Sequence, residues 1–128
     1  MENKVYFIGA GPGDPDLITV KGRKILEGAD VVIYAGSLVS KEHLNFCRKT
    51  AEIYNSASMT LKEVMEVMKD SYSDGKVIVR LHTGDPSIYG AIKEQMDELS
   101  KLNIPYEVVP GVSSFTAAAA AIKKEFTL

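Results

Sequence analysis

Five short runs of apolar residues alternate with longer segments of mixed polarity along this chain of 128 residues. The clearest runs are rich in valine and isoleucine and lack polar alternation, which is typical of strands covered on both faces. Most of the runs end at a glycine, a residue that favours turns. The five predicted strands are VYFIGAG (5–11), DVVIYAG (30–36), AEIYN (51–55), KVIVRLHTG (76–84) and YEVVPG (106–111).

The segments between the runs are predicted to be helical. Thr60 and Glu63 have the spacing of a capping box, and Gly75 is placed to end the helix that Thr60 begins. One predicted helix begins between Pro15 and Thr19 and runs to about Gly28, and the others span residues 40–49, 87–103 and 113–124. The last of them contains five consecutive alanines, and we expect these small side chains to let it approach the sheet very closely.

Strands that alternate with helices of this length predict an α/β fold with an open, mainly parallel five-stranded sheet and helices on both faces. No linker or repeat interrupts the pattern, so residues 1–128 are expected to form a single α/β domain. In such sheets, ligands bind at the carboxyl ends of the strands. The glycine- and proline-rich loops after the first, fourth and fifth strands fall at that edge.

Composition and charge narrow the possible partners. The net charge is −2 and like charges do not cluster, which argues against nucleic acid as a partner. No apolar run approaches the roughly 18 residues that span a bilayer, so no membrane partner is expected. The start of the chain lacks the segments of a signal peptide, and Cys47 is the sole cysteine. We therefore expect a cytoplasmic protein with a partly buried thiol and no metal site.

The first loop, GAGPGDPDLITVKG, departs from the known phosphate-binding patterns. Gly9 and Gly11 match the dinucleotide fingerprint, but its third glycine is replaced by Asp14, and no acidic residue ends the second strand to bind a ribose. A nucleotide phosphate loop needs Gly-Lys followed by Ser or Thr, whereas Lys76 is followed by Val77. The pattern thus disfavours a nicotinamide oxidoreductase and a polyphosphate site.

The other two loops offer backbone groups and few charges. In HTGDPSIYG, Asp85 is expected to cap a helix that starts at Pro86, and a structural role is the simpler interpretation of His82. In VPGVSSFTAA, Ser113 or Ser114 is expected to cap the alanine helix, whose N–H groups could accept a carboxylate or ribose oxygens. We expect the three loops together to outline a cleft whose walls offer backbone groups and few charges. Such a cleft suits a zwitterionic or nucleoside ligand.

Taken together, VYFIGAGPGDPDLITVKG, GDPSIYG and VVPGVSS resemble the motifs of the tetrapyrrole methylase family, which transfers methyl groups from S-adenosylmethionine to corrin and sirohaem precursors. Within the family, NFCRKTAEIYNSASM and RLHTGDPSIYGAI look most like the precorrin-4 C-11 methyltransferases, including their cobalt-precorrin-4 counterparts. Sirohaem-type members usually have GGDP and a following Phe, where this chain has Thr83 before Gly84 and then Tyr89. The resemblance implies C-11 methylation of precorrin-4 or cobalt-precorrin-4 in cobalamin biosynthesis.

The resemblance also implies a larger assembly. Family members run to roughly twice this length, carry a second α/β domain, bind the cofactor between the two domains and are typically homodimers. By this likeness the chain is the N-terminal half of a longer enzyme that acts on a tetrapyrrole, and the half alone is expected to be inactive. The alternative is a nucleotide-binding regulatory α/β module without catalysis.

Family motifs carried over position by position imply two sets of site residues. Asp14 is the one weak candidate for a catalytic group, and an N-cap role explains it equally well. Substrate contacts are implied for the glycine loop, at Gly9, Gly11, Gly13 and Asp14. Contacts with S-adenosylmethionine, or with its product S-adenosylhomocysteine, are implied for Pro12, Gly84, Asp85, Ile88, Tyr89, Ser113 and Ser114.

Overall fold

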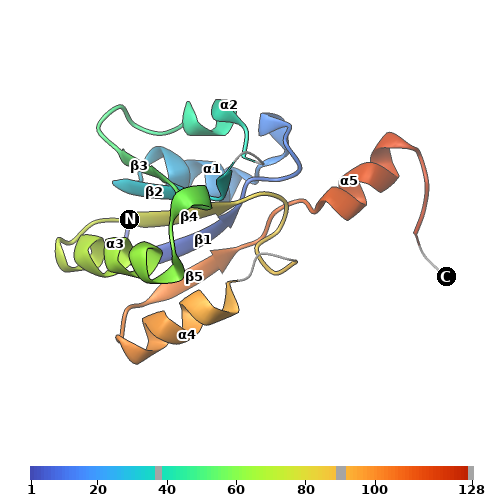
Figure 1. Ribbon diagram of the computed structural model, residues 1–128. Helices are drawn as coiled ribbons and strands as arrows, with labels where there is room; N and C mark the ends of the chain where they lie inside the picture. Colours follow the sequence, from blue (N-terminus) through green and yellow to red (C-terminus); the bar gives the residue numbers. More distant parts are fainter. Residues whose placement is uncertain (37–38, 89–91, 127–128) are drawn as a thin grey trace.

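The computed structural model describes residues 1–36, 39–88 and 92–126 (Figure 1). Its five strands form one sheet in the order β3-β2-β4-β1-β5, and every neighbouring pair is parallel. This confirms the predicted α/β fold and its parallel sheet. The strands are β1 (Val5–Gly9), β2 (Val31–Tyr34), β3 (Glu52–Asn55), β4 (Ile78–His82) and β5 (Tyr106–Val109).

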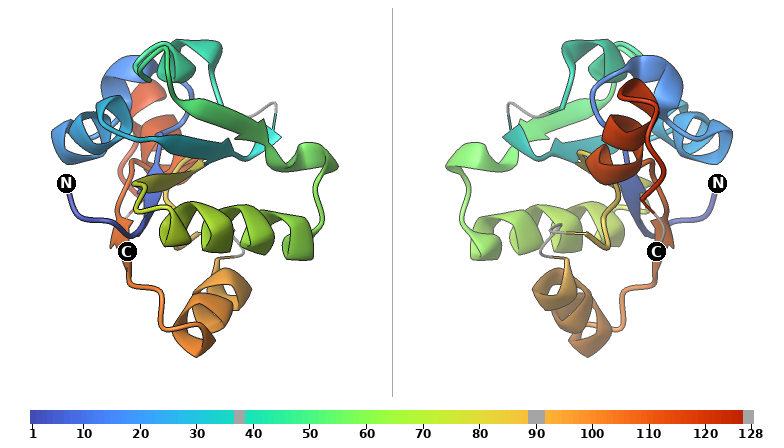
Figure 2. Two further views of the ribbon diagram at one scale, coloured as in Figure 1. Left: turned by 90° about the vertical axis from the view of Figure 1, so that its left-hand side faces the viewer. Right: turned by 90° about the vertical axis from the view of Figure 1, so that its right-hand side faces the viewer.

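Helices cover both faces of this sheet, as predicted (Figures 1 and 2). Alternate residues of β1 serve the two faces: Tyr6 and Ile8 join the core beneath α1, whereas Val5 and Phe7 join the core shared with α3 and α4. The helices are α1 (Val20–Glu27), α2 (Lys41–Leu44), α3 (Leu61–Ser73), α4 (Lys93–Lys101) and α5 (Ser114–Ala121), with short 3₁₀ turns η1 (Pro15–Leu17) and η3 (Ser56–Ser58). Among the described residues, no helix is long and apolar enough to cross a membrane.

Local capping residues fix where α1 and α3 begin. Thr60 Oγ1 accepts a hydrogen bond from the Glu63 N–H at 3.1 Å, and Glu63 Oε1 accepts one from the Thr60 N–H at 3.1 Å. The predicted capping box is thus confirmed. Thr19 caps α1 by accepting from the Gly22 N–H at 3.0 Å. Each such cap typically contributes about 1 kcal/mol to helix stability.

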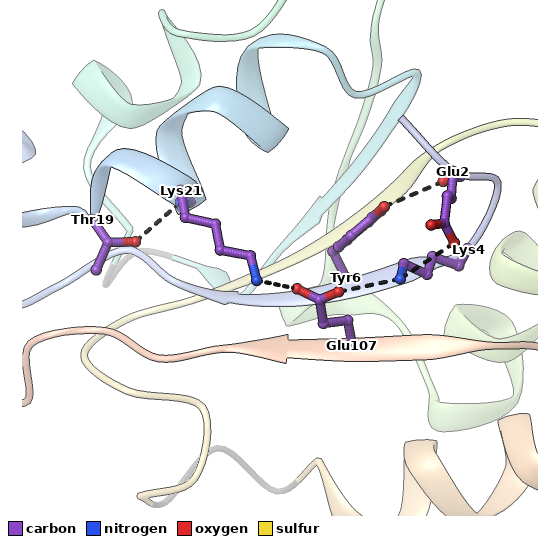
Figure 3. A network of polar contacts seen from close by, with 7 residues as sticks. Glu2, Lys4, Tyr6, Thr19, Lys21 and Glu107 are labelled. Carbon is purple, nitrogen blue, oxygen red and sulfur yellow. Dashed lines mark hydrogen bonds and ion pairs between the residues drawn. The ribbon is translucent and has the colours of Figure 1, made fainter.

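An ion-pair network ties the edge strand β5 to the rest of the domain (Figure 3). Glu107 on β5 pairs through Oε2 with Lys21 Nζ of α1 at 2.6 Å and through Oε1 with Lys4 Nζ at 3.2 Å. These partners lower the pKa of the Glu107 carboxyl, with the hydrogen bond from Lys21 contributing most and that from Lys4 next. These ion pairs add to the parallel pairing with β1 that places β5 at the edge of the sheet.

The alanine helix α5 does not approach the sheet, contrary to the sequence prediction. None of its residues is buried, and Figure 1 shows it running away from the layers of the domain. Phe115 is 63% exposed and contacts Phe126, with ring centroids 4.7 Å apart. Five alanines supply little apolar surface to bury, so they give this helix no strong stripe that would hold it against the sheet.

The fourth helix begins later than the sequence predicts. Pro86 to Ile88 form a turn closed by the Ile88 N–H donating to the Asp85 carbonyl at 3.1 Å, and α4 starts only at Lys93. Residues 89–91 of the predicted helix lie outside the described residues. The prediction extended the helical period across Gly90, a residue that disfavours helix interiors.

Candidate functional site

The loops after β1, β4 and β5 meet at the carboxyl edge of the sheet because these strands are neighbours. The Gly84 N–H donates to the Gly11 carbonyl at 2.7 Å, and the Gly11 N–H donates to the Gly84 carbonyl at 3.2 Å. This antiparallel pair joins the first and second motif loops. The edge where ligands bind in such folds is therefore built from all three motifs.

Three glycines pack backbone against backbone where these loops meet. A Cβ added to Gly9 would lie 2.4 Å from the Gly84 oxygen and 2.7 Å from Gly111 Cα, and one added to Gly111 would lie 2.2 Å from the Gly84 oxygen. Close packing of the protein on itself is thus sufficient reason for glycine at positions 9 and 111. Gly13 differs, since its φ is +124° and no neighbour lies within 4 Å of an added Cβ.

Asp85 joins the second loop to the third. Its Oδ1 accepts a hydrogen bond from the Gly111 N–H at 3.0 Å. The prediction that Asp85 caps a helix at Pro86 is wrong, because that segment is a turn and the carboxylate is used across the loops instead. The Asp85 side chain is partly buried, and its hydrogen bond to Gly111 fixes the loop after β5.

A cavity of about 720 Å³ opens beside these loops. Five of the seven residues implied for the cofactor line it, so the structure brings them together as the motifs suggest. Pro12 is not among the lining residues, and Tyr89 lies outside the described residues. The cavity is lined by Ala35, Arg80, His82, Thr83, Gly84, Asp85, Ile88, Ser113, Ser114, Phe115 and Ala118.

The rim of the cavity is apolar, with polar groups at the start of α5. Ile88 and Phe115 are both more than half exposed there. Ser113 caps α5, as predicted, by accepting from the Thr116 N–H at 3.3 Å, and Ser114 is the first residue of the helix. An exposed apolar rim with a few polar groups can hold a nucleoside-like ligand.

Two buried basic residues of β4, Arg80 and His82, also line the cavity, and the sequence analysis did not include them among the site residues. Arg80 is 7% exposed and donates from Nε to Gln95 Oε1 at 3.2 Å and from Nη1 to the Ile33 carbonyl at 3.3 Å. His82 is 4% exposed and stacks on Phe7, with ring centroids 6.3 Å apart. A charged residue inside the buried run KVIVRLH was the available signal.

The residues implied for substrate contact are Gly9, at the end of β1, and three residues of the loop that follows it. Asp14 is exposed, and its Oδ1 accepts a hydrogen bond from the Asp16 N–H at 2.9 Å. It therefore caps the turn η1, which is the N-cap role that the sequence analysis gave as the alternative to catalysis.

Cys47, the sole cysteine, is partly buried, as predicted. Burial raises the pKa of its thiol to about 11, which keeps the thiol protonated at pH 7. No group of three potential metal-ligating side chains occurs among the described residues.

The family model for Tetrapyrrole (Corrin/Porphyrin) Methylases matches residues 4–127. The chain belongs to this family. A tetrapyrrole methylase of Methanocaldococcus jannaschii, the cobalt-precorrin-4 C(11)-methyltransferase, is 62% identical over 98% of this chain and 48% of its own length. The chain therefore spans about half the length of this curated relative.

Solved structures of tetrapyrrole methylases agree with the fold. A cobalamin biosynthetic enzyme, cobalt precorrin-4 methyltransferase, superposes with a TM-score of 0.95 at 53% identity, over 98% of this chain and 53% of that one. Uroporphyrin-III C-methyltransferase from Thermus thermophilus, complexed with S-adenosylhomocysteine, gives a TM-score of 0.78 at 35% identity, over 91% of this chain and 48% of that one.

Proposed function

We propose that this chain is part of an S-adenosylmethionine-dependent methyltransferase that methylates C-11 of precorrin-4 or cobalt-precorrin-4. The observation that carries the proposal is the cavity where the three motif loops meet, because it gathers Gly84, Asp85, Ile88, Ser113 and Ser114 at one edge of the sheet. The names of the relatives at 62% and 53% identity support the substrate class. The relatives offer no support for a regulatory nucleotide-binding module.

The proposed reaction requires mainly that the protein align the methyl donor with the acceptor carbon. The sulfonium of S-adenosylmethionine carries an activated methyl group, so an electron-rich ring carbon can form the new C–C bond as the S–CH₃ bond breaks and S-adenosylhomocysteine leaves. Orienting donor and acceptor for this in-line displacement can contribute several kcal/mol to the rate. The Gly11–Gly84 pair and the Asp85–Gly111 hydrogen bond would do this by fixing the loops that surround the cavity.

We also propose that further residues complete the site in the full-length enzyme. The chain spans about half of its curated relative, and α5 presents exposed apolar side chains beside the cavity. Both facts are consistent with the second α/β domain implied by the resemblance. The homodimer that the resemblance implies is part of the same proposal and is tested by the sedimentation coefficient of the full-length enzyme.

Paired calorimetric titrations test the proposed cofactor. We expect saturable binding of S-adenosylhomocysteine and no binding of NADH, first with this chain and then with the full-length enzyme. NADH binding alone would overturn the proposal. S-adenosylhomocysteine binding by the full-length enzyme only would place part of the site outside these 128 residues.

Replacing Asp14 by asparagine separates capping from catalysis. We expect Asp14→Asn to leave both cofactor affinity and turnover of the full-length enzyme within about twofold of wild type, because the amide oxygen can still accept from the Asp16 N–H. Turnover of the corrin precursor and calorimetric affinity are the two measurements. A sharp loss of turnover at unchanged affinity would instead make Asp14 a catalytic residue.

A further inference from the structure

Arg80 is a buried cation that no described carboxylate neutralises. Its two hydrogen bonds go to neutral oxygens, the Gln95 side-chain amide and the Ile33 carbonyl, and it forms no ion pair among the described residues. Burial lowers the pKa of its guanidinium to about 10, so the group remains charged at pH 7. Buried charges are normally paired, because removing an unpaired charge from water is costly.

His82 follows Arg80 on the same face of β4 and also lines the cavity. Its Nε2 is buried and has no hydrogen-bond partner among the described residues. Burial, with a smaller contribution from Arg80, lowers the pKa of the ring to about 4, so the imidazole is neutral at pH 7. A neutral imidazole carries one N–H, and in the tautomer protonated at Nε2 this is a buried donor without an acceptor, which is rare in native proteins.

We propose that Arg80 and His82 form a receptor for one carboxylate of a ligand in this cavity. Both residues line the cavity and carry N–H groups, and a carboxylate would provide the negative charge that Arg80 lacks and an acceptor for an Nε2–H of His82. The inference rests on the proposed function for the source of the carboxylate. It is either the amino-acid end of the methyl donor or an acetate or propionate side chain of the tetrapyrrole.

A purely structural role for Arg80 is the competing explanation. Its contacts with Ile33 and Gln95 link β4 to β2 and to α4. These contacts use Nε and Nη1, whereas an arginine has five N–H donors, and the side chain also forms part of the cavity lining. A structural role would affect stability without distinguishing ligands that carry a carboxylate from ligands that do not.

Calorimetry on the wild type and on Arg80→Gln separates these roles and the two carboxylate sources. The probes are S-adenosylhomocysteine, its carboxyl methyl ester and the octacarboxylate uroporphyrin III, titrated into the full-length enzyme. A cofactor carboxylate predicts that Arg80→Gln weakens S-adenosylhomocysteine binding roughly tenfold or more and leaves binding of the ester unchanged. A tetrapyrrole carboxylate predicts the same loss for uroporphyrin alone.

Arg48→Gln is the matched control, because it removes a cation whose side chain pairs with Asp30 and is not among the cavity lining. Arg48→Gln should leave the affinity for each of the three probes unchanged. Binding of every probe to Arg80→Gln with wild-type affinity would overturn the receptor. If the wild-type enzyme binds neither S-adenosylhomocysteine nor uroporphyrin, that result would instead count against the proposed function.

Nitrogen NMR of the unmodified full-length enzyme decides the inference even if Arg80→Gln does not fold. Sodium propionate is the probe, since it supplies a carboxylate without the rest of either ligand. We expect saturable shifts of the His82 Nε2 and Arg80 guanidinium resonances, and the same titration of His82→Gln should retain the Arg80 shift. Resonances of both groups that do not respond to propionate would overturn the proposal.

Discussion

Replacing Gly111 by alanine is expected to lower the free energy of unfolding by about 3 kcal/mol, at the upper end of the usual cost of overpacking. The new Cβ would lie 2.2 Å from the Gly84 oxygen and 2.8 Å from Gly9 Cα, both of which are backbone atoms. Gly84 cannot easily withdraw, because it exchanges two hydrogen bonds with Gly11. Urea denaturation of Gly111→Ala beside the wild type measures the loss.

Gly75→Ala is the matched control for this prediction. Gly75 has a φ of +75°, so alanine there carries the strain of the left-handed region, but the nearest atom to its Cβ is the end of the Asn3 side chain at 3.9 Å. We expect a loss of about 1 kcal/mol from the backbone conformation alone. Equal losses in the two variants would contradict the close packing of the three loops.

Local features of the fold were predictable from the sequence because neighbouring residues determine them. The capping box of Thr60 and Glu63 depends on a three-residue spacing, and the valine-rich runs become buried parallel strands whichever other segments cover them. The order of strands is a different matter. The sequence gives five strands but does not place β1 between β4 and β5, which is what brings the three motif loops together.

Non-local contacts explain what the sequence analysis missed. The family motifs implied a substrate contact for Gly9, but they gave no sign that its missing side chain makes room for Gly84 and Gly111, which are more than 70 residues away along the chain. Likewise, Arg80 could be recognised as unusual within an apolar strand, but only the fold shows that it lines the cavity. The capping serine and the alanine run correctly predicted a helix at α5, while its weak apolar stripe gave no basis for packing it on the sheet.

Truncating Phe7 to alanine is expected to lower the free energy of unfolding by about 3 to 5 kcal/mol, the usual range for a buried phenylalanine. Phe7 is fully buried in the centre of β1 and packs edge-on against Tyr106, with ring centroids 6.1 Å apart. It also stacks on His82, which lines the cavity, so the empty volume would open beside that lining residue. Thermal and urea unfolding of Phe7→Ala measure the effect.

Phe115→Ala makes the same substitution at a residue that is mostly exposed on α5. We expect it to change the free energy of unfolding of the 128-residue chain by no more than about 0.5 kcal/mol, because its ring contacts Phe126 and contributes to no core cluster. Phe7→Leu, which deletes fewer atoms, should cost about half as much as Phe7→Ala and remains measurable if the alanine variant does not fold. A loss for Phe115→Ala as large as that for Phe7→Ala would mean that α5 packs against the domain after all, and the position of this helix at the cavity rim would then be wrong.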